Sequence, residues 1–124
     1  MTFRADRTVP ILRIFDVDKA REFYVGYAGF TVDWEHRFDD GMPLYMQVSR
    51  DGIVLHLSEH HGDGTPGTAV YVYATDVRAL HAELRSREYG YLNPGLGEGH
   101  DGSACLTLLD PFGNTLRIEE RAPR

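Results

Sequence analysis

The 124-residue sequence is poor in cysteine and has no long hydrophobic run. Its single cysteine, Cys105, cannot form a disulfide within the chain. No apolar run approaches the roughly 20 residues that a membrane-spanning helix needs, and the N-terminal segment lacks the apolar core of a signal peptide. A lone thiol is typical of a reducing compartment. We therefore expect a cytoplasmic protein without a membrane partner.

Positive charge is also scarce. The chain has 13 Lys and Arg against 19 Asp and Glu, a formal net charge of −6. Binding to a phosphate backbone needs clustered Lys and Arg, so no nucleic-acid partner is expected. An acidic surface can favour cationic ligands, but more often it only aids solubility. The hydrophobic content of 42% is ordinary for a soluble globular protein.

Two features recur along the chain at similar spacing. Phe15-Asp16-Val17 leads into a helical pattern, and Thr75-Asp76-Val77 does the same 60 residues later. A turn at Asp51-Gly52 precedes one apolar strand, and Asp110-Pro111-Phe112-Gly113 precedes another. A repeat of this kind indicates a duplicated unit.

Each half is predicted to contain one strand, one helix and three more strands. The first half has a strand at 8–15, a helix at 19–28, and strands at 31–36, 44–49 and 53–58. The second has a strand at 68–74, a helix from 77 to about 86, a weak strand from 92, and strands at 104–109 and 115–121. The sequence thus predicts one α+β domain of two βαβββ modules, 8–59 and 68–121, joined by a Gly- and Pro-rich linker at 60–67.

The first helix shows the expected capping and packing signals. Asp16 or Asp18 can cap its N-terminus. Four apolar residues recur at the spacing of a buried helical stripe, namely Ala20, Phe23, Tyr24 and Tyr27.

Several short motifs together resemble one protein superfamily. They are Val9-Pro10-Ile11-Leu12, Asp16-Val17, Glu22-Phe23-Tyr24, Gly29-Phe30 and Asp110-Pro111-Phe112-Gly113-Asn114. The chain resembles the glyoxalase / bleomycin-resistance / extradiol-dioxygenase (vicinal oxygen chelate) superfamily, and within it most resembles the bleomycin-resistance proteins. The resemblance implies paired βαβββ units whose sheets curl around a cleft, with helices outside and the cleft usually completed in a homodimer.

The metal-binding positions of this superfamily can be checked one by one. The resemblance places the two first-strand ligands, usually His or Gln, at Val9 and Ala69, and the last-strand Glu at Arg117. Valine and alanine carry no donor atom, and a guanidinium repels a cation. His56 is the only potential ligand left, and one histidine does not make a metal site. We expect neither a metal nor another cofactor.

Strand alternation then predicts what lines the cleft. If Val9 and Ala69 face inward, so do Ile11, Arg13 and Phe15 on the first strand and Tyr71 and Tyr73 on the strand at 68–74. The same alternation predicts that Leu55, Leu57 and Leu116 pack on the opposite face. A wet pocket explains such a surface better than a buried core does. The predicted ligand-binding residues are Arg13, Phe15, Trp34, Tyr45, Gln47, His56, Tyr71, Tyr73, Arg117 and Glu119. Trp34 is either a stacking plate or a packing residue, because alternation places it on the same side as Val32.

These predictions favour a metal-free binding protein that sequesters a planar polar ligand, such as a bleomycin-type antibiotic, in the cleft of a homodimer. Drug binders of the family often carry a Trp-Gly pair where this chain has Asp101-Gly102. Arg13 and Arg117 make an anionic ligand as reasonable as a cationic one. An alternative is a lyase or isomerase of the superfamily that uses His56 with Glu119 as an acid–base pair, or a displaced metal. A third reading is a family member with an unrelated small ligand.

Overall fold

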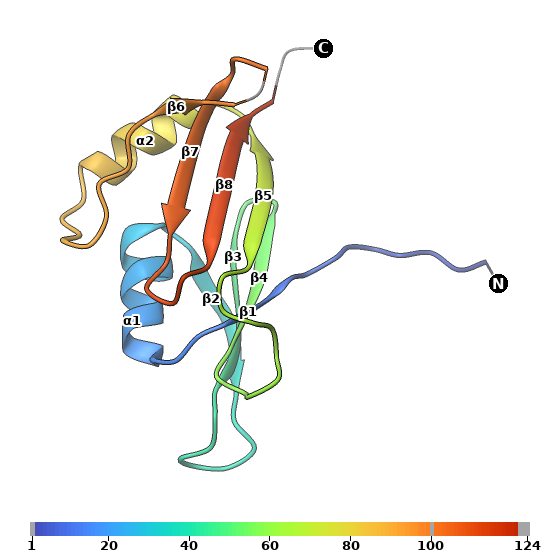
Figure 1. Cartoon of the computed structure of the whole chain (residues 1–124). Helices are drawn as coiled ribbons and strands as arrows, with labels where there is room; N and C mark the ends of the chain where they lie inside the picture. Colours follow the sequence, from blue (N-terminus) through green and yellow to red (C-terminus); the bar gives the residue numbers. More distant parts are fainter. Residues whose placement is uncertain (1, 100, 122–124) are drawn as a thin grey trace.

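Eight strands form two four-stranded mixed sheets in the computed structural model, which describes residues 2–99 and 101–121 (Figure 1). The first sheet has the order β1-β4-β3-β2, with β1 (Ile11–Arg13), β2 (Thr31–His36), β3 (Tyr45–Arg50) and β4 (Ile53–Ser58). The second has the order β5-β8-β7-β6, with β5 (Ala69–Ala74), β6 (Gly97–Glu98), β7 (Ala104–Leu109) and β8 (Thr115–Glu120). In each sheet the first strand pairs in parallel with the last, and the remaining pairs are antiparallel.

The two predicted helices begin at the predicted aspartates. Helix α1 (Val17–Arg21) continues as a π-helical segment η1 (Glu22–Tyr27), and the second helix is α2 (Val77–Arg85). Asp16, rather than Asp18, caps α1 by accepting a hydrogen bond from the Lys19 amide at 3.0 Å. Asp76 caps α2 in the same way through the Ala79 amide at 3.1 Å.

Two predicted strands are shorter than expected. β1 spans only Ile11–Arg13. The carbonyl of Pro10 still accepts from the His56 amide at 3.0 Å, but proline has no N–H with which to extend the ladder. The weak strand predicted from Leu92 onward reduces to the two residues of β6.

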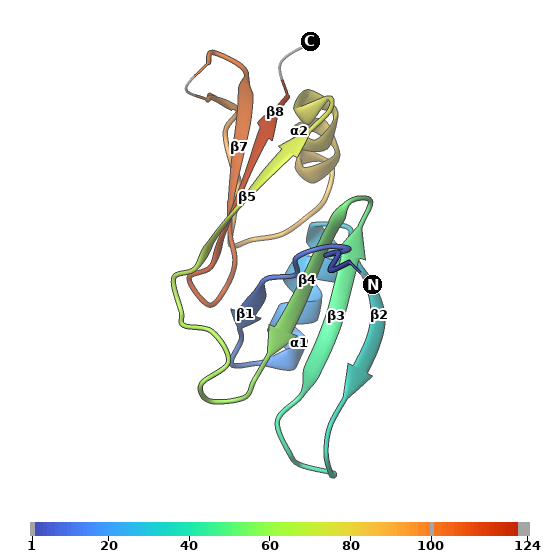
Figure 2. The same cartoon turned by 90° about the vertical axis from the view of Figure 1, so that its right-hand side faces the viewer.

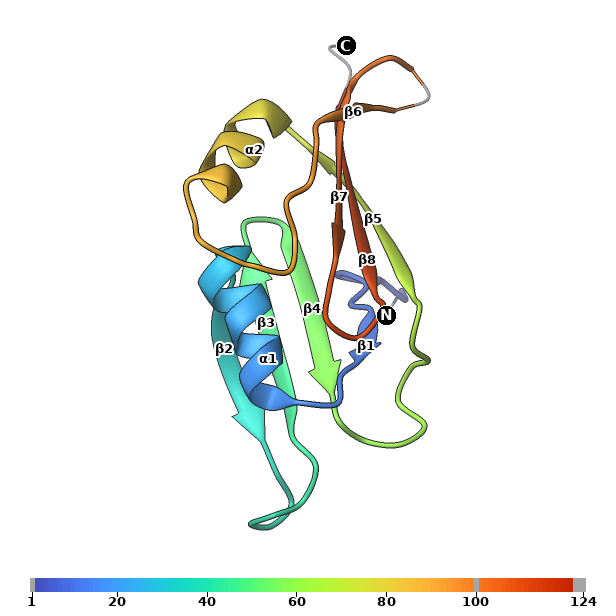
Figure 3. The same cartoon turned by 60° about the vertical axis from the view of Figure 1, so that its left-hand side comes forward.

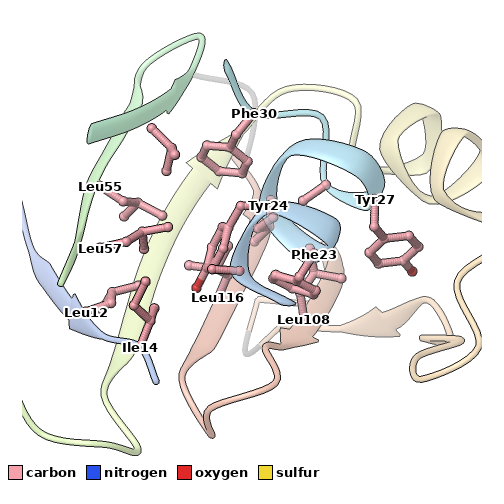
Figure 4. Close-up of a cluster of buried hydrophobic side chains, with 14 of the residues drawn as sticks. Leu12, Ile14, Phe23, Tyr24, Tyr27, Phe30, Leu55, Leu57, Leu108 and Leu116 are labelled. Carbon is pink, nitrogen blue, oxygen red and sulfur yellow. The ribbon is translucent and has the colours of Figure 1, made fainter. Parts of the chain in front are cut away.

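The α1–η1 helix lies against the inner face of the first sheet. The stripe residues Phe23 and Tyr24 are fully buried, and they share the core with Leu12, Leu55 and Leu57 of the sheet (Figure 4). Leu108 and Leu116 of the second sheet belong to the same cluster. Burial of each such side chain contributes roughly 1.5–3 kcal/mol. The predicted packing of Leu55, Leu57 and Leu116 is confirmed by their burial.

The Asp110–Asn114 turn ties the two halves together. The Tyr24 hydroxyl donates to Asp110 Oδ2 at 2.6 Å, and Asp110 Oδ1 accepts from the Phe112 and Asn114 amides at 2.8 Å each. Asn114 Nδ2 in turn donates to the Arg13 carbonyl at 2.9 Å. Burial, with the nearby Asp110 carboxylate, raises the pKa of Tyr24 well above its usual range. The motif therefore has a structural role, which is to fasten the last hairpin to the first helix and strand.

An ion-pair cluster forms a second tie. Arg50, at the end of β3, makes a bidentate pair with Glu83 of α2 at 2.7 and 2.9 Å and also donates to the Ala28 carbonyl at 2.8 Å. Arg87 donates to the Tyr27 carbonyl at 2.6 Å and lies 2.8 Å from Glu83. These bonds fix α2 against the end of η1.

Both helices lie on the same side of the sheets (Figure 3). The two sheets are arranged end to end and do not close into a barrel (Figure 2). The predicted α+β fold of two βαβββ modules is confirmed. Within one chain, however, the open faces of the two sheets point the same way and do not oppose each other.

Candidate functional site

The open face of the first sheet carries a chain of hydrogen-bonded polar side chains. Gln47 of β3 and His56 of β4 are direct partners in the strand register. The Tyr45 hydroxyl lies 2.7 Å from His56 Nδ1, and His56 Nε2 lies 3.0 Å from Gln47 Oε1. Three of the predicted ligand-binding residues are therefore joined side by side.

Asp33 fixes the direction of every hydrogen bond in this series of side chains. Its carboxylate accepts from Gln47 Nε2 and from Ser49 Oγ, both at 3.0 Å, and these bonds lower the pKa of Asp33. An ionised carboxylate can only accept, so the amide of Gln47 is oriented with its oxygen toward His56. His56 Nε2 must then carry the proton, and the bare Nδ1 accepts from the Tyr45 hydroxyl.

This series of side chains is held by hydrogen bonds and is electrically neutral at His56 and Tyr45. Burial, with the nearby Arg7 charge, lowers the pKa of His56. Burial, with the Asp63 charge, raises the pKa of Tyr45. Both ring nitrogens of His56 are engaged, and a phenolate at Tyr45 is disfavoured. His56 therefore presents no free base within this group of side chains.

Trp34 lies on the same open face because of a β-bulge. Val32 pairs with Val48, but Trp34 pairs with Gln47, so Asp33 is an extra residue in β2. The bulge reverses the alternation beyond it. Trp34 stacks on Tyr45 with ring centroids 5.9 Å apart and an interplanar angle of 9°. The expectation that Trp34 shares a side with Val32 is wrong.

The open face of the second sheet holds four predicted residues. Tyr71 and Tyr73 of β5 pair with Arg117 and Glu119 of β8, respectively. The tyrosines are 44% and 63% exposed, and their ring centroids lie 5.3 Å apart. The Tyr71 hydroxyl donates to Glu119 Oε2, which raises the pKa of Tyr71 to about 12.

Glu119 is far less accessible than Tyr71, Tyr73 and Arg117 on the same face. Only 2% of the residue is exposed, and within the described part of the chain its Oε1 atom has no hydrogen-bond partner. Gly99 lies directly against this carboxylate, since a Cβ atom there would come within 1.4 Å of Oε1. His56 stands on the other sheet, so the alternative acid–base pair of His56 and Glu119 is not assembled within one chain.

Arg13 and Phe15 form a third, separate group. The Arg13 guanidinium carbon lies 4.8 Å from the Phe15 ring centroid, and the Phe15 and Phe112 rings are 6.2 Å apart. They stand where β1 meets the Asp110–Asn114 turn. The ten predicted residues thus occupy three places, and the structure does not gather them into one pocket.

A cavity with a volume of about 810 Å³ lies where the two modules meet. It lies between the β3–β4 turn of the first sheet and β5 and α2 of the second, with Arg7 also in its wall. Of the predicted ligand-binding residues, only Tyr71 and Tyr73 line it. Sequence reasoning did not anticipate this cavity, because it depends on how the two modules meet.

The residues at the superfamily metal positions do not fit a divalent ion. Val9 and Ala69 offer no donor atom, and Arg117 stands beside Tyr71 as an exposed cation. Across residues 2–99 and 101–121, no three His, Cys, Asp or Glu side chains are grouped closely enough to hold a metal. None of the described helices is long and apolar enough to cross a membrane.

A family profile described as "Glyoxalase superfamily protein" matches residues 2–123. The chain belongs to the glyoxalase superfamily. No curated protein matches it at a significant level.

Solved structures of antibiotic-binding proteins share this superfamily member's fold. The chain is 22% identical to a bleomycin-binding protein complexed with bleomycin, and the two structures align with a TM-score of 0.70 over 95% of this chain and 100% of that chain. The bleomycin-binding protein of bleomycin-producing Streptomyces verticillus, complexed with copper(II)-bleomycin, is 27% identical, with a TM-score of 0.69 over 98% and 100% of the two chains. TnmS3, an antibiotic-binding protein from Streptomyces sp. CB03234, is 21% identical, with a TM-score of 0.69 over 97% and 100%.

Proposed function

We propose that this protein is a metal-free binding protein that sequesters a planar, polar small molecule in clefts shared by two copies of the chain. The observation that carries the proposal is the aromatic and polar open face on each sheet, where a metal-dependent relative would need ligands that this chain lacks. The fold shared with bleomycin- and antibiotic-binding proteins supports the same class of function.

The arrangement of the two sheets supports a homodimer. Both open faces point to the same side, and Tyr71 and Tyr73 on the second sheet are 44% and 63% exposed. A second copy, turned by a two-fold axis, would lay its second sheet over the first sheet of its partner. Two equivalent clefts would result, each walled by Trp34 and Tyr45 on one side and Tyr71 and Tyr73 on the other.

The chemistry of the two walls restricts the ligand. The Tyr45 hydroxyl donates a hydrogen bond to His56 Nδ1, so the Tyr45 oxygen offers the cleft a lone pair. The opposite wall offers the exposed guanidinium of Arg117. A ligand with a flat ring system, a hydrogen-bond donor and an acidic or carbonyl group would satisfy both walls. Bleomycin-type glycopeptides are the first compounds to test.

Titration calorimetry with metal-free and copper-loaded bleomycin tests the proposal. We expect saturable binding at micromolar protein, with one ligand per chain, and a dimer mass by light scattering. The variant Tyr73→Ala should weaken binding, whereas Tyr91→Ala, on the helical side, should not. The absence of heat would remove the bleomycin assignment. A monomer at binding concentrations, or stoichiometric metal in the purified protein, would contradict the proposal itself.

A further inference from the structure

A second hollow lies on the helical side of the molecule, away from the open faces of the sheets. It has a volume of about 560 Å³. It is bounded by η1 and by the segment after α2, both on the helical side in Figures 1 and 3. Its lining residues are Glu22, Gly26, Tyr27, Glu88, Tyr89, Gly90 and Tyr91. Neither the predicted ligand site nor the proposed function uses any of them.

Three tyrosine rings form a corner in this hollow. Tyr27 is 3% exposed and points to the side of the helix opposite Leu12 and Leu57 (Figure 4). It stacks on Tyr89, with centroids 4.6 Å apart and an interplanar angle of 22°. Tyr91 meets Tyr89 edge to face at 5.5 Å and 69°, and is 82% exposed. A stacked pair, with Tyr27 buried and Tyr89 partly buried, thus supports an accessible ring.

The charge of the hollow is negative. Glu22 and Glu88 line it, and no Lys or Arg is among its lining residues. The cations next to these two glutamates in sequence are engaged elsewhere: Arg87 by Glu83 and the Tyr27 carbonyl, and Arg21 by Glu35. Burial raises the pKa of Tyr89, and the Glu22 carboxylate adds to this effect. The site would repel an anion.

The local backbone keeps the hollow open. The π-helical turn of η1 is wider than an α-turn, and such turns are frequent at functional sites. Gly26 places no side chain there, and its own packing does not require glycine, because an added Cβ would meet nothing closer than the Arg21 carbonyl at 3.9 Å.

We propose that this hollow binds an alkylated ammonium group. The inclined rings of Tyr89 and Tyr91, with two carboxylates in the same lining, attract a soft, weakly hydrated cation by cation–π and charge attraction. An unmodified ammonium is strongly hydrated and gains less from aromatic rings. The group can belong to a free choline-like molecule or to a methylated lysine side chain of a peptide. This inference is independent of the ligand in the sheet clefts.

NMR titration of the full chain with choline tests the inference, with the neutral tert-butyl isostere of choline as the matched probe. We expect shifts of the Tyr89 and Tyr91 ring signals with choline, and binding of the isostere at least about fivefold weaker, the factor that one cation–π interaction supplies. Equal binding of both probes, or shifts confined to Tyr71 and Tyr73, would overturn the proposal.

Three variants sharpen the test. Tyr91→Ala removes an exposed ring and should weaken choline binding about fivefold. Glu22→Gln preserves shape and should weaken choline but not the isostere. Tyr73→Ala, on the other side of the molecule, is the control for this hollow and should leave the choline affinity unchanged, although it should weaken the ligand of the sheet clefts. Unchanged choline affinity in both Y91A and E22Q contradicts the assignment. A trimethyllysine peptide that binds tighter than choline identifies a peptide as the source of the group, and equal affinity identifies a small molecule.

Discussion

The open faces of the two sheets differ in how their polar side chains are paired. On the first, Gln47 pairs with His56, and every link from Tyr45 to Asp33 is a hydrogen bond within the face. On the second sheet, Thr107 and Arg117 occupy the equivalent paired positions. A charged guanidinium therefore stands where the first sheet has a neutral imidazole. One face uses its polar groups to hold itself rigid, whereas the other keeps charge available. We infer that the open face of the first sheet provides a preformed surface for stacking, and that the open face of the second sheet distinguishes between ligands.

The largest effect on stability should come from the Asp110–Asn114 turn, which holds the two sheets together. Asp110→Ala leaves the Tyr24 hydroxyl, two backbone amides and the Asn114 side chain without their buried acceptor. We expect a loss of about 3 kcal/mol or more in the free energy of unfolding, measured by urea denaturation. Tyr24→Phe, which removes one bond, should cost about 1 kcal/mol. A smaller loss in Asp110→Ala than in Tyr24→Phe would refute the role of the turn.

Glu119→Gln tests the charged character of the second face. It removes the carboxylate that raises the pKa of Tyr71 to about 12, so this pKa should fall toward the ordinary value of 10.0. Because the folded pKa is the higher one, its stabilising contribution is present below pH 10 and is lost as pH rises toward 12. NMR titration of the Tyr71 ring measures the change, with Tyr45 as an internal reference that should not move.

Acid tests the first face. The pKa of His56 lies below its ordinary value of 6.5, so the folded protein binds this proton less well than the unfolded chain does. The stabilising contribution is therefore complete above pH 6.5 and is lost as pH falls through the lower folded pKa. Protonation of Nδ1 also breaks the Tyr45 bond. Thermal unfolding between pH 7 and 5 should show a decline that His56→Gln reduces; an equal decline in that variant would exclude His56 as its source.

The smallest effect on stability should come from Asp33, which is exposed. Asp33→Ala frees the Gln47 amide to rotate, so His56 should change from one tautomer to a mixture while the melting temperature scarcely moves. Nitrogen NMR of the imidazole reports the tautomer. Ser49→Ala, which removes the other partner of Asp33, should leave the tautomer as it is. A single unchanged tautomer in Asp33→Ala would mean that another contact orients the ring.

Local patterns predicted the fold well, because each rested on one physical rule. Period-two alternation placed Leu55 and Leu57 in the core, and the capping aspartates located both helices. The errors arise where a rule is interrupted. One extra residue at Asp33 turned Trp34 to the open face, and the sequence carries no sign of that bulge.

Contacts between distant segments escaped prediction altogether. The burial of Glu119 depends on Gly99 in a different loop, and the stacking of Tyr27 on Tyr89 joins residues from the two halves. Alternation places both Arg117 and Glu119 on one face but cannot reveal that a loop covers only the second. Nine of the ten predicted site residues lie in the strands predicted for them, and Phe15 lies just beyond β1, but the structure does not gather them into one site.

The fastening of the last hairpin onto the first helix has a consequence for how the polypeptide could be divided. Because Tyr24, Asp110 and Asn114 hold the halves together without help from the connecting segment, a backbone cut near Pro66 should leave a non-covalent pair of fragments that copurify. The molecule would then serve as a complementation reporter, in which two separately expressed pieces regain their structure only on meeting.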